Sequence, residues 1–311
     1  MDLFICSTAL QTVIAQRIIH EKKLINYEIF YFTHVESDKE KYYFHQLENK
    51  SRKSIFYLCR TRFPKYFLDI KRLFKAKKYN CIYLASVDNV YAHLVLTHCV
   101  FSKLITFDDG ASNISKDSIY YISRRSKFTA IIYFLLGCRY SLEKVKRSSV
   151  EHFSIYPNRK NIIDNVSLIS LFGEDNLARD MPVLNDECHV FLGSLLHVVA
   201  NTNADYLSVK LEKYFKGLEN FFYIQHPKDN SNYFNSFEKL PGNLIAEDLI
   251  VELGKKFKTV NVYGIGSAAL FNLIGVEWVN IHTLVSPEVK SQFNDLSHSL
   301  VELGGNPFHI E

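Results

Sequence analysis

The chain has 311 residues, of which 47% are hydrophobic and 23% are charged. This length predicts one large domain or two ordinary ones, and the composition excludes a disordered protein. The formal net charge is only +4, which excludes a uniformly basic protein that coats nucleic acid.

Short apolar segments alternate with helical segments in the first part of the chain. The helical segments carry their apolar residues at the spacing of an amphipathic helix. Strands are predicted at residues 3–7, 27–34, 53–59, 80–86 and 103–107, and helices at 9–23, 63–78 and 89–99. Strands that alternate with helices predict a mostly parallel, doubly wound α/β sheet.

The middle of the chain, residues 119–182, is expected to be less regular and to close an N-terminal domain of residues 1–182. Its most apolar segment is FTAIIYFLLGC at residues 128–138. That segment is too short to span a bilayer, so it is predicted to be a buried or interfacial helix.

The alternation then restarts and predicts a second Rossmann-like domain at residues 183–311. Strands are expected at residues 189–194, 220–227, 259–267 and 277–284, and helices at 205–219, 246–256, 268–275 and 286–305. The expected architecture is therefore two α/β domains that face a cleft.

Polar residues follow four of the predicted strands. They are Asp108-Asp109-Gly110, Gly193-Ser194, His226-Pro227 and Gly264-Ile265-Gly266-Ser267. Ligands of open α/β sheets bind beyond the carboxyl ends of the strands. These residues are therefore candidates for a substrate-binding edge.

The acidic doublet is the first candidate for catalysis. Two adjacent carboxylates repel each other, so the pair of Asp108 and Asp109 is not expected to stabilise the fold. One of them is a candidate general base whose pKa is raised by burial and by its neighbour. The alternative is an ordinary turn, because Asp-Gly is a common turn dipeptide.

The other candidates suit an anionic ligand. A protonated His226, held by the strand-ending Pro227, can bind a phosphate or give it a proton. The glycine turn at Gly266 and the hydroxyl of Ser267 favour a phosphate site over a dinucleotide site. Glu247 lies at the start of a predicted helix. The alternatives are a turn histidine and an ordinary charge in a first helical turn.

Several of these segments, taken in order, resemble glycosyltransferase family 52, the bacterial lipooligosaccharide sialyltransferases. They are FICSTALQTVIAQRII, IYLASVDNV, ITFDDGASN, FLGS, QHP, AEDLI and GSAALF. The resemblance implies a GT-B fold and inverting transfer of sialic acid from CMP-sialic acid. It also implies a galactose-terminated acceptor of lipooligosaccharide or capsule, with no metal and no cofactor.

The resemblance also implies roles for single residues. His226 matches the histidine that contacts the donor phosphate and is proposed as general acid, and Ser267 matches the serine that binds the same phosphate. Glu247 matches the acidic residue near the cytidine ribose. Asp108 and Asp109 match the doublet that supplies the general base, and we favour Asp109.

One departure from the family concerns the turn at Gly193-Ser194. Some members carry their proposed base shortly after this turn, but here the first acidic residue after it is Asp205. Either Asp109 is the base or the donor chemistry differs. The remaining alternatives are a related transferase that uses a UDP-sugar, such as a glucosyltransferase, and a non-catalytic module that binds glycans or nucleotides.

The N-terminus, the cysteines and the basic runs predict the cellular location and the binding partners less specifically than the motifs predict the site. The N-terminus lacks the basic region of a signal peptide, and six dispersed cysteines predict free thiols in a reducing compartment. We expect a cytoplasmic protein without a tight membrane anchor. Basic runs at residues 71–78, 123–127 and 144–147 favour an anionic partner such as the inner face of the membrane, or are solvated helix faces. The family resemblance also implies that the chain forms a homodimer. No nucleic-acid partner is expected.

Overall fold

The computed structural model describes residues 1–115, 118–122, 126–157, 159–173 and 185–310. The chain divides into two compact units, Met1–Gly173 and Glu174–Glu311. The boundary predicted between residues 182 and 183 lies outside the described residues.

The first unit is a parallel sheet with strand order β3-β2-β1-β4-β5-β6-β7. Its strands are β1 (Asp2–Cys6), β2 (Tyr27–Thr33), β3 (Lys53–Leu58), β4 (Lys78–Leu84), β5 (Val100–Phe107), β6 (Ser149–Ser154) and β7 (Val166–Leu168). Its helices are α1 (Ala9–Glu21), α2 (Asp38–Glu48), α3 (Lys65–Phe74), α4 (Val90–His98), α5 (Lys127–Leu135) and α6 (Leu142–Ser148), with a 3-10 turn, η1 (Ala111–Asn113).

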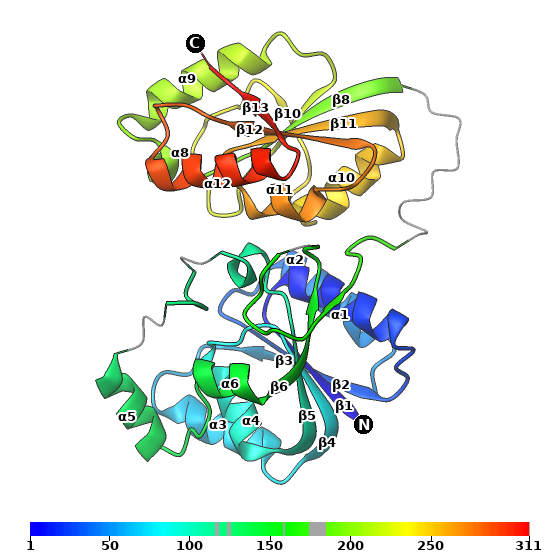
Figure 1. Ribbon diagram of the computed structural model, residues 1–311, viewed down its shortest axis with the longest axis vertical. Coiled ribbons are helices and arrows are strands. Elements are labelled where there is room, and N and C mark those ends of the chain that lie inside the picture. The colour runs from blue at the N-terminus through cyan, green and yellow to red at the C-terminus, as the bar shows by residue number, and fades with distance from the viewer. Residues whose placement is uncertain (116–117, 123–125, 158, 174–184, 311) are drawn as a thin grey trace. The chain divides into compact units, whose positions relative to one another are not determined.

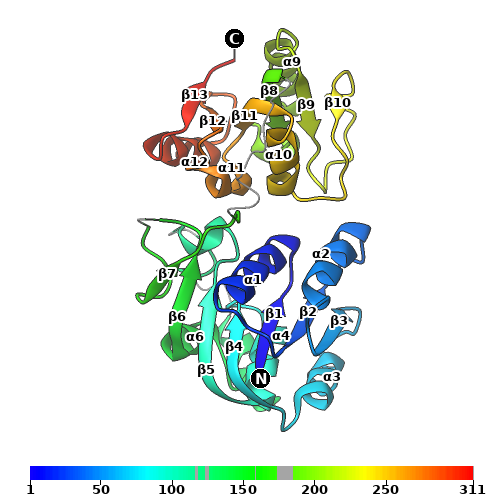
Figure 2. The same ribbon diagram turned by 90° about the vertical axis from the view of Figure 1, so that its right-hand side faces the viewer.

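Helices cover both faces of this sheet (Figures 1 and 2). α1 packs beside α2, and α3 packs beside α4. Apolar side chains of β1 and β2 form one core with those of α3, α4 and α6. Thr8 and Asn89 cap α1 and α4 by accepting backbone N–H groups. Because Thr8 follows β1 closely, its cap fixes the chain at the carboxyl end of that strand.

The second unit is a parallel sheet with strand order β10-β9-β8-β11-β12-β13. Its strands are β8 (Asn185–Leu192), β9 (Phe221–Ile224), β10 (Glu238–Lys239), β11 (Phe257–Gly264), β12 (Val279–Leu284) and β13 (Asn306–Phe308). Its helices are α8 (Leu196–Val199), α9 (Ala204–Phe215), α10 (Ala246–Gly254), α11 (Ala268–Leu273) and α12 (Ser291–Glu302). The core on the α9 face is aromatic, with Phe191, Phe215 and Tyr223 fully buried.

The expected pair of doubly wound α/β units is confirmed. In each unit the chain lays its first six strands in the order third, second, first, fourth, fifth, sixth. The order reverses between the first and fourth strands, which are β1 and β4 in one unit and β8 and β11 in the other. Ligands of such sheets bind outside the carboxyl ends of the strands at this switch point.

The segment expected to be irregular differs from the prediction, because it adds β6 and β7 to the first sheet. β6 has the sequence SVEHFS, in which His152 and Ser154 are buried polar residues. A strand that buries polar side chains lacks the apolar pattern that sequence analysis detects.

The apolar helix of the middle segment is present as α5, but it is not a buried helix. Phe128 and Leu135 are 73% and 77% exposed. No helix among the described residues is long and apolar enough to cross a membrane.

Candidate active site

Three neighbouring strand ends of the first unit are joined by the side chain of Gln11. This residue lies in the first turns of α1 and is fully buried. Its Nε2 donates to Ser86 Oγ, after β4, at 3.0 Å and to Asp109 Oδ1, after β5. Its Oε1 accepts the backbone N–H of Ser7, after β1, at 2.6 Å. Gln11 therefore ties Asp109, at the end of β5, to the ends of β1 and β4, between which the strand order reverses.

The carboxylate of Asp109 is held at both oxygens. Oδ1 accepts from Gln11, and Oδ2 accepts from the Tyr120 hydroxyl. Burial raises the pKa of Asp109, the hydrogen bonds from Tyr120 and Gln11 oppose that shift, and the nearby charge of Asp108 adds to it. Asp109 remains partly exposed. An oriented carboxylate with a raised pKa, on a residue that keeps some exposed surface, has the properties of a general base.

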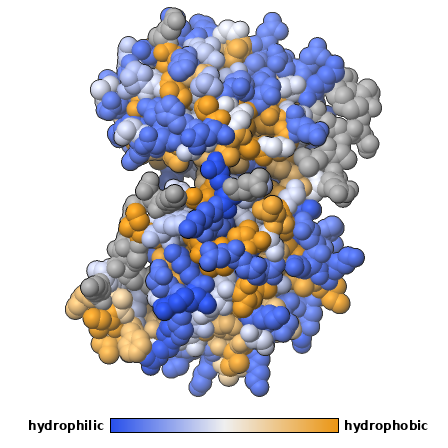
Figure 3. Space-filling model, viewed as in Figure 1, coloured by the Kyte–Doolittle hydropathy of each residue, from blue (hydrophilic) through white to orange (hydrophobic). Residues whose placement is uncertain are grey.

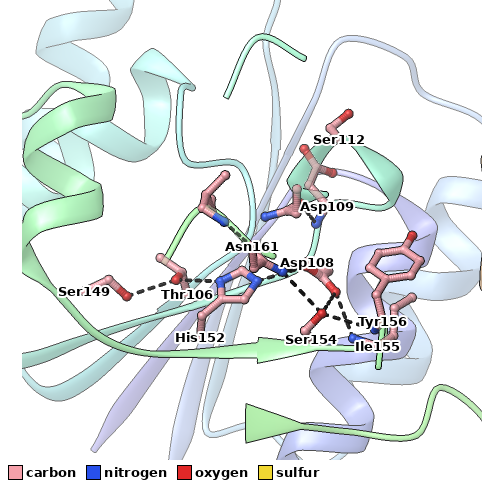
Figure 4. Close-up of polar contacts among 12 residues, drawn as sticks. Thr106, Asp108, Asp109, Ser112, Ser149, His152, Ser154, Ile155, Tyr156 and Asn161 are labelled. Atoms are coloured by element: carbon pink, nitrogen blue, oxygen red, sulfur yellow. Dashed lines mark hydrogen bonds and ion pairs between the residues drawn. The ribbon is translucent and has the colours of Figure 1, made fainter. Parts of the chain in front are cut away.

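The neighbouring carboxylate of Asp108 has a different environment, with no exposed surface. It accepts from His152 Nε2 at 2.9 Å, Ser154 Oγ at 2.8 Å, Ile155 N at 2.8 Å and Asn161 Nδ2 at 3.1 Å. Figure 4 shows these donors around Asp108, with the carboxyl group of Asp109 turned to another side. The Asp108 carboxylate thus has no exposed surface for contact with a substrate, and its hydrogen bonds tie the turn after β5 to β6 and to the segment that follows.

His152 links the Asp108 carboxylate to β5. Its Nδ1 lies 2.8 Å from Thr106 Oγ1, and it has no exposed surface. Nε2–H faces the carboxylate and donates to it, while Nδ1 lies at hydrogen-bond distance from the Thr106 hydroxyl. The pair of His152 and Asp108 thereby ties the end of β5 to β6.

Gly110 completes the turn after the doublet. Its φ is +82°, in the left-handed region that favours glycine. The backbone N–H of Asp109 donates to Asn113 Oδ1, in η1, at 2.7 Å. Gly110 therefore lets the chain reverse into η1 while Asp109 stays at the strand end.

In the second unit, the turn at Gly193 packs closely against β9. Its backbone N–H donates to Ile224 O at 2.8 Å. A Cβ at this position would lie 2.6 Å from the Tyr223 hydroxyl oxygen and 2.9 Å from Ile224 O. Ser194 follows and is partly exposed at the same edge. The absence of a side chain at Gly193 is therefore a packing requirement.

His226 follows β9 and is partly exposed. Its Nδ1 accepts the backbone N–H of Lys228 at 3.1 Å. A neutral ring that accepts at Nδ1 carries its proton on Nε2, so this nitrogen is the donor. Pro227 is exposed and lies in the turn after β9, which ends at Ile224 rather than at the proline as predicted.

Ser267 and Glu247 are joined through α11. Ser267 caps this helix and accepts the N–H of Ala269, which leaves its hydroxyl hydrogen to donate. Gly266, before it, has φ of +53°. Glu247, in the first turn of α10, is 6% exposed and accepts from Asn272 Nδ2, in α11, at 2.7 Å.

The structure therefore brings the predicted residues together within each unit. Gly193-Ser194, His226 and Gly266-Ser267 follow β8, β9 and β11, which are adjacent parallel strands. Asp108, Asp109 and Gly110 lie together at the carboxyl edge of the first sheet.

Sequence reasoning missed the side chains that support Asp109. The sequence places Gln11 in a predicted amphipathic helix without a role in the site, although a buried amide just after a strand is a weak signal of a polar network. Tyr120 and His152 lie in the segment expected to be irregular, so no pattern pointed to them. Among the residues that the structure describes, no group of three or more His, Cys, Asp or Glu side chains is placed to hold a metal ion.

Comparison with known proteins identifies relatives over most of the chain. The model of glycosyltransferase family 52 matches residues 25–288. The "CMP-N-acetylneuraminate:beta-galactoside alpha-2,3-sialyltransferase" of Pasteurella multocida (strain Pm70) is 27% identical, over 88% of this chain and 87% of that protein. The "N-acetyllactosaminide alpha-2,3-sialyltransferase" of Haemophilus influenzae (strain ATCC 51907 / DSM 11121 / KW20 / Rd) is 27% identical, over 94% of this chain and 95% of that protein.

A solved structure shows the same fold at low sequence identity. The crystal structure of a UDP-N-acetylglucosamine 2-epimerase superimposes with a TM-score of 0.50 and 10% identity. The match covers 99% of this chain and 82% of that one. It confirms the expected GT-B type of architecture, with two Rossmann-like units.

Replacing Asp108 with Asn tests its structural role. The amide nitrogen would face donors that now point at a carboxylate, so we expect the free energy of unfolding to fall by about 2 kcal/mol. Urea denaturation measures this loss. Asp164 is exposed, so Asp164→Asn is the control and should change stability by less than about 0.5 kcal/mol. Equal midpoints for Asp108→Asn and the unsubstituted protein would contradict the structural role.

Replacing Gly193 with Ala tests the close approach to β9. The added methyl group would overlap Tyr223 and the Ile224 carbonyl, so we expect a loss of roughly 1–3 kcal/mol. A Cβ at Gly217 meets no atom within 4 Å, which makes Gly217→Ala the matched control. Thermal denaturation of the two variants should show destabilisation at Gly193 alone, and an unshifted Gly193→Ala would refute the packing argument.

Proposed function

The chain belongs to glycosyltransferase family 52, and from this membership we propose that it is an inverting, metal-independent sialyltransferase. The proposed donor is CMP-sialic acid, and the acceptor is a galactose-terminated glycan of bacterial lipooligosaccharide or capsule. Two relatives over most of the chain are named sialyltransferases. Both names specify an alpha-2,3 linkage, which supports the same linkage for this protein.

One observation carries the mechanism: the carboxylate of Asp109, a partly exposed residue, is oriented by Gln11 and Tyr120 beside the switch point of a doubly wound sheet. As general base it takes the proton of the acceptor hydroxyl. The acceptor oxygen then forms a bond to the anomeric carbon of sialic acid while the bond from that carbon to the phosphate oxygen breaks. General base assistance of this kind contributes roughly 10²–10⁴-fold to the rate.

Asp108 supports this base through its position. Its carboxylate accepts from four donors, and its charge adds to the effect of burial in raising the pKa of Asp109. A base with a raised pKa accepts a proton more readily near neutral pH. The adjacent carboxylates thus have separate roles, one in positioning and one in proton transfer.

The second unit supplies the groups proposed to bind the donor. CMP leaves with negative charge growing on its phosphate, and donors aimed at that charge stabilise the transition state. We assign this role to His226, through Nε2–H, and to the hydroxyl of Ser267. Gly193, Ser194, Pro227 and Gly266 shape the same edge.

Glu247 is proposed to contact the ribose of the cytidine. Its hydrogen bond from Asn272 fixes the side chain, and a carboxylate oxygen can accept more than one hydrogen bond. The proposal also includes a cytoplasmic location, contact with the inner face of the membrane and a homodimer. These three features come from the sequence and from the family.

Donor choice tests the reaction itself. Purified protein is incubated with lactose and EDTA, and with CMP-sialic acid, UDP-glucose or UDP-galactose in separate reactions. We expect mass spectrometry to find sialylated lactose from CMP-sialic acid alone. Because Asp109 is the base, Asp109→Asn should lower kcat by roughly 10²–10⁴-fold. CMP binding, measured by calorimetry, should be unchanged, and Asp164→Asn should remain fully active.

Two outcomes would contradict the proposal. A hexose transferred from a UDP-sugar would assign another donor to the same fold. An Asp109→Asn variant that keeps its rate would remove Asp109 from the mechanism.

The pH dependence of kcat/KM tests the environment of Asp109. Because burial raises its pKa, the acidic limb should lie above the ordinary aspartate value of about 3.9. The hydrogen bond from the Tyr120 hydroxyl lowers the pKa of Asp109, so Tyr120→Phe should raise that pKa further. The acidic limb of the profile should therefore shift to higher pH in this variant. Tyr79 also donates to a carboxylate, that of Glu28, and Tyr79→Phe is the control. An unshifted limb in Tyr120→Phe would show that Asp109 does not titrate in catalysis.

A further inference from the structure

Helix α5 is attached to the first unit by one face. Its Tyr133 ring packs against Phe67, with ring centroids 5.4 Å apart, and against Phe63 at 6.1 Å. The Tyr133 hydroxyl lies 3.4 Å from that of Tyr66. Since these three partners lie on or just before α3, this face fixes the helix on the protein.

The other face of α5 carries large apolar side chains that are exposed. Phe128 is 73%, Ile131 57%, Phe134 56% and Leu135 77% exposed. Residues 128, 131 and 135 have the spacing of one helix face. Figure 3 shows hydrophobic surface gathered at the position of α5. A clustered apolar surface of this kind marks an interaction site, unlike apolar residues that are exposed singly.

Basic residues border this apolar face. The Arg139 guanidinium lies 4.4 Å from the centroid of the Phe134 ring, and Lys144 Nζ lies 4.4 Å from that of Tyr140. Lys144 also donates to the Arg139 carbonyl, which carries no net charge. Residues 127–147 contain five basic residues and one acidic residue, an excess equal to the net charge of +4 of the whole chain. The segment that contains α5 and the residues after it is therefore basic, like the run at residues 71–78.

We propose that the outer face of α5, with Arg139 and Lys144, is a docking surface for an anionic lipid bilayer. Such a helix lies in the plane of the interface, with its apolar side chains among the acyl chains and its cations at the lipid phosphates. The nine residues of α5 are too few to span a bilayer. A second copy of the chain is a poorer occupant, because it would bring two basic segments together.

The inference names a partner for the proposed function and rests on it in one respect. A lipooligosaccharide acceptor is carried in a lipid surface, so a transferase held at that surface meets its acceptor at high local concentration. The exposure and charge of α5 do not depend on which sugar is transferred. Binding to vesicles and transfer to soluble lactose therefore test the two proposals separately.

Flotation of the full chain with vesicles tests the docking surface. We expect it to bind vesicles of phosphatidylglycerol mixed with phosphatidylcholine, and not vesicles of phosphatidylcholine alone. Binding should weaken as salt is added, because salt screens the attraction between the cations and the lipid phosphates. Failure to bind the anionic vesicles overturns the proposal, as does equal binding to both kinds.

Variants locate the binding on the protein. Both Ile131→Ser with Leu135→Ser and Arg139→Gln with Lys144→Gln should weaken binding at least about tenfold, through lost apolar burial and lost charge respectively. Ile25 is 92% exposed and lies outside α5, so Ile25→Ser is the control and should bind normally. Circular dichroism should show that all variants are folded, and transfer to lactose should be unchanged.

The remaining outcomes are decisive as well. If Ile131→Ser with Leu135→Ser leaves vesicle binding intact but turns a dimer into a monomer in analytical ultracentrifugation, α5 is a self-association surface and the proposal is wrong. A chain that binds anionic vesicles but does not sialylate lactose supports the docking surface and contradicts the proposed function instead.

Discussion

The buried carboxylate of Asp108 is the interaction on which the candidate base depends. A charge without solvent contact must be compensated by hydrogen bonds, because leaving it unpaired costs several kcal/mol. Here the compensation comes from His152, Ser154, Ile155 and Asn161. All four donors belong to β6 and the segment after it. Satisfying Asp108 therefore fixes the end of β5 against β6.

This arrangement explains why two acidic residues stand side by side at the end of a buried strand. Asp108 is fully buried and accepts from four donors, whereas Asp109 is held by Gln11 and Tyr120 and is partly exposed. Burial raises the pKa of Asp109, and repulsion from the neighbouring charge of Asp108 adds to this shift. A structural cost thus produces the property that a general base requires.

The two units share a strand order but carry different residues near their switch points. Both have the same strand order, so both have a switch point at which loops diverge and backbone and side-chain groups are accessible. In the first unit the carboxylate of Asp109 lies near this point, and the side chain of Gln11 contacts three strand ends. The second places a histidine, a serine and close-packed glycines there, a set suited to a phosphate. Family membership and fold do not assign these roles by themselves, because function resides in the site.

The sequence by itself determined the alternation of strands and helices, and hence two parallel sheets with polar residues at their carboxyl edges. These features are local, since apolar periodicity and strand-end residues can be recognised within a few positions. Only the tertiary structure decided which carboxylate is buried, that β6 completes the site, and that the apolar α5 is exposed. Gln11 contacts Asp109 across 98 positions, and His152 contacts Asp108 across 44. Contacts between residues so far apart arise only when strand order brings their elements together, and no local pattern records that order.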